Sequence, residues 1–430
     1  MVEGQAPVGG FQIGSDVRWI EQPGIVGEQV GKVTSESQIN YFAGIVGGKY
    51  KQFIMANTTY LDRFGNFWLP DSDQFAWLNP YTGNQHNRAM FTHLVIGAVA
   101  ARLRAVNGNR PRLIEPFVGS GQIYLNACKH AAEFNRGQPL FAEVIAGDLN
   151  PYVIAAHSLM RSLGNDFVVG YKAFAETWDG KAQGSQPDAS YLELRNWTDT
   201  DGRRAAKGQQ NERRDAAFAY IYLVNRCTRG SKLNNLGGVT VTMDKAKLTR
   251  LASIRASESK ALTACVGTLS SLKCSFGHRD FADTCAEAEP TDLVIMDCPF
   301  PDFSYTVPNT LPQPGTEPSL QGLQQAGTYG TGDDGSSLQI KIVQQIKNLT
   351  SQGTTVLVCN FANPELVLAY RHLIATPGGE GGKQSYVFTY KSPSTTSEAY
   401  QLAVIPGNGL NLDLTMQEIL KIWGEWGGFG

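Results

Sequence analysis

An acidic residue ends a short apolar run in the second half of the chain. Asp297 directly follows Leu-Val-Ile-Met and begins the tetrapeptide Asp297-Cys298-Pro299-Phe300. Four consecutive apolar residues predict a buried strand. A carboxylate at the end of such a strand is costly unless it has a partner or a task. The tetrapeptide is therefore the first candidate for a reaction centre.

A glycine turn provides a second candidate site, in the first half of the chain. Phe117-Val-Gly119-Ser-Gly121 follows a strand-like run and opens a helical stretch, so the backbone could approach a ligand closely there. The turn lacks the third glycine of a dinucleotide-binding fingerprint, and no lysine follows it as in a phosphate-binding P-loop. It therefore predicts a ligand without phosphates, the alternative being a tight turn that binds nothing.

A second carboxylate follows the next predicted strand. Asp148 comes 27 residues after Gly121, at the end of the strand-like run 142–147. An acid at this place can accept hydrogen bonds from ribose hydroxyls, as in nucleoside-binding sheets generally. The alternative is a helix N-cap, a task for which Asn150, directly before Pro151, competes.

The periodicity of the sequence predicts an α/β fold around these residues. Apolar residues recur at helical spacing from Ala89 to Val106, and a strand, the glycine turn and a second helix follow. The last two of the later strands are separated by a polar turn, which predicts an antiparallel hairpin on an otherwise parallel sheet. Short apolar runs between turns predict these further strands: 142–147, 292–296, 354–359, 385–390 and 399–405.

Composition narrows the class of protein. Of 430 residues, 42% are hydrophobic and 18% are charged, which is typical of a soluble globular chain. Basic residues number 37 against 39 acidic ones, so a nucleic-acid partner would require basic groups gathered on one face. The seven cysteines form no CxxC pair and no cluster with histidines, which argues against a metal site and disulfides and favours the cytoplasm. The apolar stretch Leu94 to Ala101 is too short to span a bilayer, and we expect no membrane partner.

Taken together, these segments resemble the Dam-like group of DNA adenine N6-methyltransferases. That family's tetrapeptide Asp-Pro-Pro-Tyr, with Phe also found last, is similar to residues 297–300. Glu115–Gly121 looks like its cofactor motif, and Asp148–Asn150 looks like its ribose-binding segment. Further similar segments fall in the family's order and extend the resemblance over residues 79 to 405: Tyr81–Gln85, Tyr124–Asn126, Phe218–Thr228, Gly237–Gly238, Gly277–Phe281, Tyr329–Gly332 and Val358–Asn360.

The resemblance implies S-adenosylmethionine as the cofactor and assigns residues to it. The implied cofactor-binding residues are Tyr81, Gln85, Phe117, Gly119, Gly121, Asp148, Asp280 and Phe281. Gln85 stands where relatives often carry lysine, which would weaken cofactor binding unless the matching segment lies a few residues away.

The resemblance also implies a chemical role for each residue of the tetrapeptide. The lone pair of adenine N6 is delocalised into the ring, so this amine is a poor nucleophile. The Asp297 carboxylate and the Cys298 carbonyl would accept hydrogen bonds from its two N–H groups. This favours in-line transfer of a methyl group from a sulfonium to the nitrogen. Phe300 would stack on a base swung out of the duplex, and Pro299 would stiffen the turn.

Cys298 departs from the family's pattern, because it stands where the family has proline. One interpretation is a covalent nucleophile, as in cytosine C5 methylation. Those enzymes use Pro-Cys, whereas this chain has Cys-Pro and contains no Pro-Cys. We favour a tolerated small apolar substitute.

Changes in composition along the chain, together with the resemblance, divide the chain into four predicted parts and predict the nucleic-acid contacts. Arg226, Arg229 and Lys232 flank a Gly/Asn-rich loop and are expected to contact phosphates or bases. The charged segment 199–215 also fits a solvated mixed-charge face. The predicted parts are a β-rich N-terminal extension (1–75), a cofactor-binding half (76–160), an inserted target-recognition region (161–275) and a catalytic half (276–430).

These observations predict a doubly wound, Rossmann-like α/β methyltransferase with an inserted target-recognition domain. It would transfer methyl from S-adenosylmethionine to adenine N6 of double-stranded DNA, with no metal. One alternative is the same chemistry on RNA or on cytosine N4. Another is a non-catalytic nucleic-acid-binding relative, in which Cys298 and Gln85 mark the loss of activity.

Overall fold

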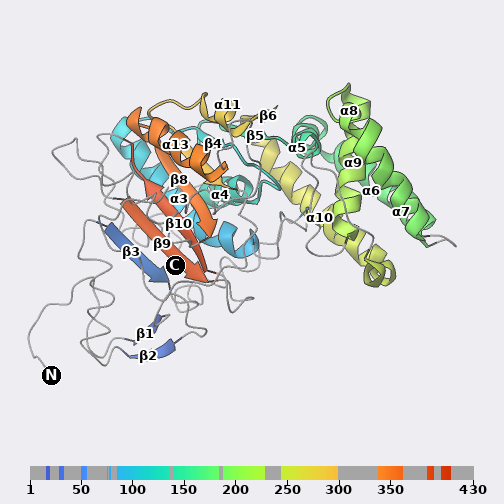
Figure 1. Cartoon of the computed structure of the whole chain (residues 1–430), viewed down its shortest axis with the longest axis horizontal. Coiled ribbons are helices and arrows are strands. Elements are labelled where there is room, and N and C mark those ends of the chain that lie inside the picture. The colour runs from blue at the N-terminus through green and yellow to red at the C-terminus, as the bar shows by residue number, and fades with distance from the viewer. Residues whose placement is uncertain are drawn as a thin grey trace, which may run out of the picture. The chain divides into compact units, whose positions relative to one another are not determined.

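The chain is an α/β protein in which most strand pairings are parallel (Figure 1). It divides into two compact units. The turn unit comprises residues 69–93 and 112–286, and the tetrapeptide unit comprises residues 1–68, 94–111 and 287–430. A computed structural model describes residues 16–19, 29–32, 50–55, 75, 77–78, 85–134, 139–183, 187–227, 244–298, 338–361, 385–391 and 399–407.

The turn unit contains three parallel strands with β5 in the middle. These are β4 (Leu113–Glu115), β5 (Val144–Asp148) and β6 (Cys274–His278). β4 is buried throughout, including Glu115, and β5 is buried except at its last residue, as is typical of parallel strands covered on both faces. Each strand leads through a short turn into a helix: α4 (Gln122–Phe134), α5 (Pro151–Leu163) and α11 (Phe281–Cys285). The three turns therefore meet at the carboxyl edge of the strands.

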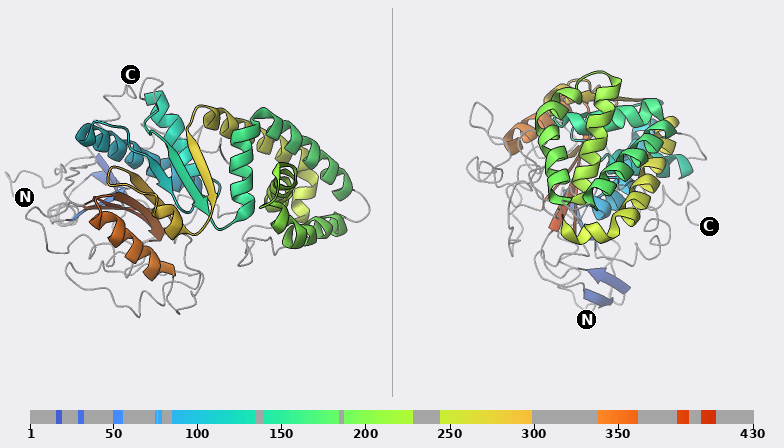
Figure 2. Two further views of the ribbon diagram at one scale, coloured as in Figure 1. Left: turned by 90° about the horizontal axis from the view of Figure 1, so that it is seen from above. Right: turned by 90° about the vertical axis from the view of Figure 1, so that its right-hand side faces the viewer.

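Most of the other described residues of the turn unit are helical. Its long helices lie side by side in both views of Figure 2, and α9 is buried from Ala216 to Arg226 between its neighbours. The sequence predicts an inserted target-recognition domain at residues 161–275. The helices of this range belong to the same compact unit as β4 to β6. That they contact nucleic acid stays a prediction. The helices are α6 (Asn165–Ala182), α7 (Pro187–Trp197), the π-helix η3 (Thr198–Gly202), α8 (Arg203–Ala205), α9 (Gln210–Arg226), the 3-10 helix η4 (Lys245–Arg250) and α10 (Leu251–Ser270).

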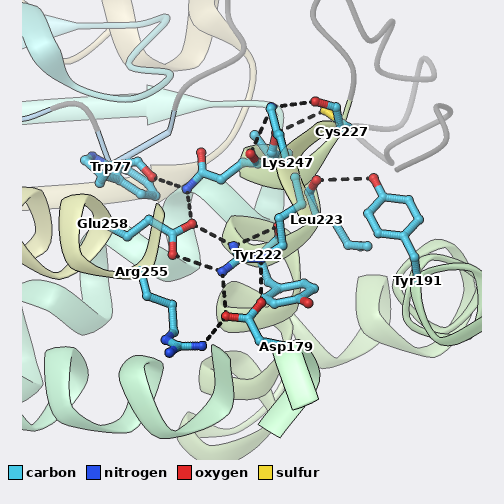
Figure 3. Close-up of polar contacts among 12 residues, drawn as sticks. Trp77, Asp179, Tyr191, Tyr222, Leu223, Cys227, Lys247, Arg255 and Glu258 are labelled. Carbon is cyan, nitrogen blue, oxygen red and sulfur yellow. Dashed lines mark hydrogen bonds and ion pairs between the residues drawn. The ribbon is translucent and has the colours of Figure 1, made fainter. Parts of the chain in front are cut away.

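A buried ion-pair network joins three of these helices (Figure 3). Arg226 on α9 has no exposed side-chain surface and pairs with Asp179 on α6 (3.0 Å) and Glu258 on α10 (2.8 Å). Arg255 pairs with the other oxygen of Asp179, and the Tyr222 ring lies 3.8 Å from the Arg226 guanidinium. Burial raises the pKa of the Glu258 carboxyl, and the guanidinium of Arg226 opposes that rise. The buried Arg226 and the partly exposed Arg255 thus compensate two buried carboxylates.

The tetrapeptide unit contains a mixed sheet with the order β3-β9-β10-β8-β7. β7 and β8 are parallel, β10 is antiparallel to both β8 and β9, and β3 is parallel to β9. A separate antiparallel pair is formed by β1 and β2. The elements are β1 (Asp16–Trp19), β2 (Gln29–Lys32), β3 (Tyr50–Met55), β7 (Leu293–Asp297), α13 (Leu338–Ser351), β8 (Thr355–Phe361), β9 (Ser385–Lys391) and β10 (Ala399–Ile405). The helix α3 (Gln85–Asn107) runs from the turn unit into this one along the chain.

The predicted helix and strands are found at the expected positions. The α/β class and the antiparallel pairing of the last two strands are confirmed. β6 was not predicted as a strand, because its sequence Cys-Ser-Phe-Gly-His contains no apolar run; all five residues are half-buried or exposed. Among the described residues, no helix combines the length and apolarity that crossing a membrane requires.

Replacing Arg226 tests the buried network. Arg226→Met leaves Glu258 without its cation, and removing one partner of a buried pair typically costs 3–5 kcal/mol, so we expect a loss of about 4 kcal/mol in the free energy of unfolding. Urea unfolding followed by circular dichroism measures it.

The matched control is Arg204→Met, which removes the same charge from an exposed pair with Asp201. Because exposed pairs contribute little, this variant should lose less than about 1 kcal/mol. Equal losses in the two variants would contradict the stabilising role of the network.

Candidate functional site

The glycine turn after β4 has a backbone that only glycine adopts without strain at two positions. Gly119 has φ +47° and Gly121 has φ +70°. The turn is closed by hydrogen bonds from the Val118 amide to the Gly147 carbonyl (3.0 Å) and from the Gly121 amide to the Val118 carbonyl (2.7 Å). The predicted strand–turn–helix geometry is therefore present.

The two glycines serve different purposes. A Cβ atom on Gly121 would overlap the ring of Tyr124 and lie 2.6 Å from Cε1 of His157. A Cβ atom on Gly119 would meet nothing within 4 Å among the described residues. Gly121 is thus required by internal packing, whereas Gly119 leaves an open backbone surface that a ligand could approach.

Asp148 connects the first turn to the second. Its Oδ2 accepts from the Gly119 amide (2.9 Å) and its Oδ1 accepts from the Asn150 amide (2.8 Å). Burial raises the pKa of this carboxyl, and the two amide hydrogen bonds oppose that rise. Each carboxylate oxygen keeps a lone pair beyond these bonds, so the group can still accept from a ligand hydroxyl.

Asn150, not Asp148, is the N-cap of α5. The Asn150 side chain accepts from the amides of Tyr152 (3.0 Å) and Val153 (3.4 Å), and Pro151 occupies the first helical position. The alternative capping task of Asp148 is thereby excluded for α5. The carboxylate instead bridges two turns at the edge where a ligand would bind.

The third turn, after β6, carries Asp280 and Phe281. Asp280 caps the short helix α11 by accepting from the Ala282 amide (2.9 Å). Phe281 is buried and stacks on Phe117 of the first turn, with ring centroids 5.2 Å apart and planes 22° apart. The structure therefore brings six of the predicted cofactor residues together at one edge: Phe117, Gly119, Gly121, Asp148, Asp280 and Phe281.

His157 on α5 contacts the backbone of the glycine turn. This residue was not identified from the sequence. Its Nε2 lies 3.0 Å from the Gly119 carbonyl oxygen and its Nδ1 lies 3.0 Å from the Tyr124 hydroxyl. Since a carbonyl only accepts, Nε2 carries the hydrogen and Nδ1 accepts from Tyr124. Burial lowers the pKa of His157 to about 4, so the ring is neutral near pH 7. A lone histidine on an apolar helix gives no sequence signal for this task.

The tetrapeptide begins at the end of β7 in the other unit. Residues 293–296 are fully buried, and Asp297 at the strand end is partly exposed, as expected for a carboxylate that ends a buried strand. The Cys298 thiol is buried and donates to the Met296 carbonyl (3.6 Å). Pro299 and Phe300 lie outside the described residues.

Several other predicted site residues are not described. Tyr81, Arg229 and Lys232 lie outside the described residues, and Gln85 is described only as the first residue of α3. Within the described part of the chain, no group of three or more His, Cys, Asp or Glu side chains is arranged to hold a metal ion.

The prediction that Arg226 contacts nucleic acid is corrected by the structure. Its side chain has no exposed surface, and its guanidinium is engaged by Asp179 and Glu258. A phosphate could reach it only by displacing a carboxylate from a buried pair, which is strongly unfavourable. Its neighbour Lys247 donates to the carbonyls of Asn225 (3.0 Å) and Cys227 (2.6 Å).

No protein-family model matches the sequence, and a search of curated proteins finds no match.

The neutral, buried His157 predicts a specific loss of stability in acid. In the unfolded chain the imidazole has its ordinary pKa of 6.5. Between that pH and about pH 4 the unfolded state therefore binds a proton, whereas the folded state keeps His157 neutral. Stability from this residue is present above pH 6.5 and falls by about 2 kcal/mol between about pH 7 and about pH 5.

The measurement compares urea unfolding of the wild type and His157→Gln at both pH values. The glutamine has no group that titrates in this range, so the fall in unfolding free energy should be smaller by about 2 kcal/mol. An equally steep fall in both proteins would show that His157 is not the responsible group.

Proposed function

We propose that this chain is an S-adenosylmethionine-dependent methyltransferase that acts on adenine N6 of DNA. The observation that carries the proposal is the bridge from the Gly119 amide to Asp148, with no atom of the described residues within 4 Å of a Cβ placed on Gly119. It joins two of the segments in which the sequence resembles the Dam-like family.

The chemistry of this edge suits a nucleoside without phosphates. The amides of Val118, Gly119 and Gly121 are used within the protein, and a carboxylate faces the same turn. A phosphate needs free backbone donors and would be repelled by this carboxylate. Ribose hydroxyls, in contrast, can donate to the remaining lone pairs of Asp148.

The aromatic pair beside this edge suits a planar ring. Phe117 is half-buried and stacks on the buried Phe281, so the pair gives the edge an apolar side. Asp280, at the start of α11, adds a carboxylate next to that side. These residues would hold the nucleoside part, and S-adenosylmethionine would supply an electrophilic methyl group on its sulfonium.

The proposed reaction places the tetrapeptide at the amino group. The Asp297 carboxylate and the Cys298 carbonyl would accept hydrogen bonds from the two N–H groups of N6. These hydrogen bonds would raise the electron density on the nitrogen as it attacks the methyl carbon. Transfer would break the C–S bond of the sulfonium as the N–C bond forms and would release the neutral thioether, and the methylated nitrogen would then lose one proton to water past the Asp297 carboxylate. Fixed acceptors, and not a strong base, would supply most of the rate.

The decisive experiment mixes the purified full chain with tritiated S-adenosylmethionine and unmethylated duplex DNA. Nucleoside mass spectrometry should find N6-methyladenine. RNA and N4-methylcytosine serve as parallel arms that test the target. Methylation of RNA alone would contradict the DNA assignment, and absence of both cofactor binding and methylated nucleosides would contradict the proposal.

Asp297→Asn separates chemistry from cofactor binding. We expect methyl transfer to fall by at least about 100-fold, the typical cost of losing one preorganised group, with an unchanged dissociation constant for the cofactor. Asp166→Asn, at an exposed carboxylate on α6, is the control and should keep full activity. Equal activity of the two variants would remove Asp297 from the proposed mechanism.

Gly119→Ala tests the open backbone surface. The added methyl group would occupy the space above the turn, so the cofactor's dissociation constant should rise by at least about tenfold. Gly108→Ala is the control: Gly108 also has a positive φ (+76°) and open space, but it follows α3 and belongs to none of the three turns. Isothermal titration calorimetry measures both, and equal affinities would place the ligand elsewhere.

A further inference from the structure

Helix α9 contacts the second turn of the site through Tyr220. Asn150 donates from Nδ2 to the Tyr220 hydroxyl (2.8 Å), while its Oδ1 caps α5. The Tyr220 ring stacks on Tyr152 in the first turn of α5, with centroids 5.0 Å apart and planes 6° apart. Both ends of the Asn150 amide are thereby fixed. Its backbone amide, which donates to Asp148, is held in place with it.

The same helix reaches the first turn through Asn225 and Trp77. Asn225 donates from Nδ2 to the Trp77 carbonyl (2.8 Å) and to Glu258 (2.8 Å). The Trp77 indole N–H donates to the Ser120 carbonyl (2.8 Å), between the two glycines with positive φ. Trp77 also lies edge-on to His157, with centroids 5.2 Å apart, and His157 itself donates to Gly119.

Both contacts are made by the same helix, α9. Tyr220 and Asn225 are five residues apart on α9, or about 7.5 Å along the helix axis. The residue after Asn225 is Arg226, whose ion pairs tie α9 to α6 and α10. Any shift of α9 would therefore displace the turns after β4 and β5 together.

We propose that α9 positions the ligand site, with Tyr220 and Trp77 as positioning residues for S-adenosylmethionine. This inference rests on the proposed function. Tyr220 acts through Asn150 on Asp148, and Trp77 acts through Ser120 and His157 on Gly119. Loosening either contact widens the distribution of Asp148 and Gly119 positions and weakens binding without removing any group that touches the ligand.

The test compares two tyrosines that each make a hydrogen bond within the same helical group. Tyr220→Phe keeps the ring stack and removes the hydroxyl that accepts from Asn150 Nδ2. Tyr191→Phe is the control, because the buried Tyr191 hydroxyl donates to the Leu223 carbonyl of α9 (3.2 Å, Figure 3) and touches neither turn. Each variant loses one buried hydroxyl, so we expect similar falls in melting temperature.

The affinities should differ where the stabilities do not. By calorimetry with S-adenosylmethionine at a temperature where all proteins are folded, Tyr220→Phe should bind about tenfold more weakly and Tyr191→Phe as tightly as the wild type. Trp77→Phe, which loses the donor to Ser120, should weaken binding in the same direction. Should Trp77→Phe fail to fold, the comparison of the two tyrosines still decides.

The outcomes separate this inference from the proposed function. A wild type that binds no S-adenosylmethionine overturns both. A wild type that binds, with Tyr220→Phe and Tyr191→Phe indistinguishable in affinity, overturns the positioning role alone. Weaker binding by both tyrosine variants in proportion to their lost stability also overturns it, since it would reduce the effect to general destabilisation.

Discussion

The buried guanidinium of Arg226 fixes the arrangement of the helices around it. A cation that has left water must be matched by carboxylates that have left water too, and here they come from α6 and α10. The planar guanidinium presents its donors in a fixed fork, which restricts where Asp179 and Glu258 can lie. Burial of an uncompensated charge is strongly unfavourable, so other packings of these helices are disfavoured.

The consequences of this constraint extend to the edge of the strands. Asn225 shares the Glu258 carboxylate with Arg226 and passes the restraint to Trp77, which holds the turn after β4. The turn after β5 is held by Tyr220 on the same helix. Contacts from the helices thus restrain both turns of the proposed ligand site.

The sequence predicted the elements whose signals are local. Continuous apolar runs identified β5 and β7, and two glycines identified the first turn. The roles of Asp148 and Asn150 remained open, since both residues favour caps and their hydrogen-bond partners decide between them. Arg226 was misassigned because its partners lie 47 and 32 residues away, a separation that no periodicity reveals.

Long-range hydrogen bonds also explain why the supporting residues escaped prediction. In the sequence, His157 and Trp77 have the pattern of ordinary core residues. They support the first turn by donating to its backbone carbonyls, which are distant in sequence. Such carbonyls carry no side-chain signature. The prediction of a ligand without phosphates, in contrast, followed from an absent lysine and an absent glycine, which the sequence displays directly.

The hydrogen-bond partners of the backbone amides in the first turn give that prediction a physical basis. In a phosphate-binding turn the amides point outward and stay free for the anion. Here the Gly119 amide is turned onto Asp148, and the amides of Val118 and Gly121 are bound to carbonyls. The edge thus offers acceptors where a phosphate site offers donors, and His157 is kept neutral beneath it by burial. Because the protein's own amides hold the Asp148 carboxylate in place, a ligand hydroxyl would meet an acceptor that is already oriented.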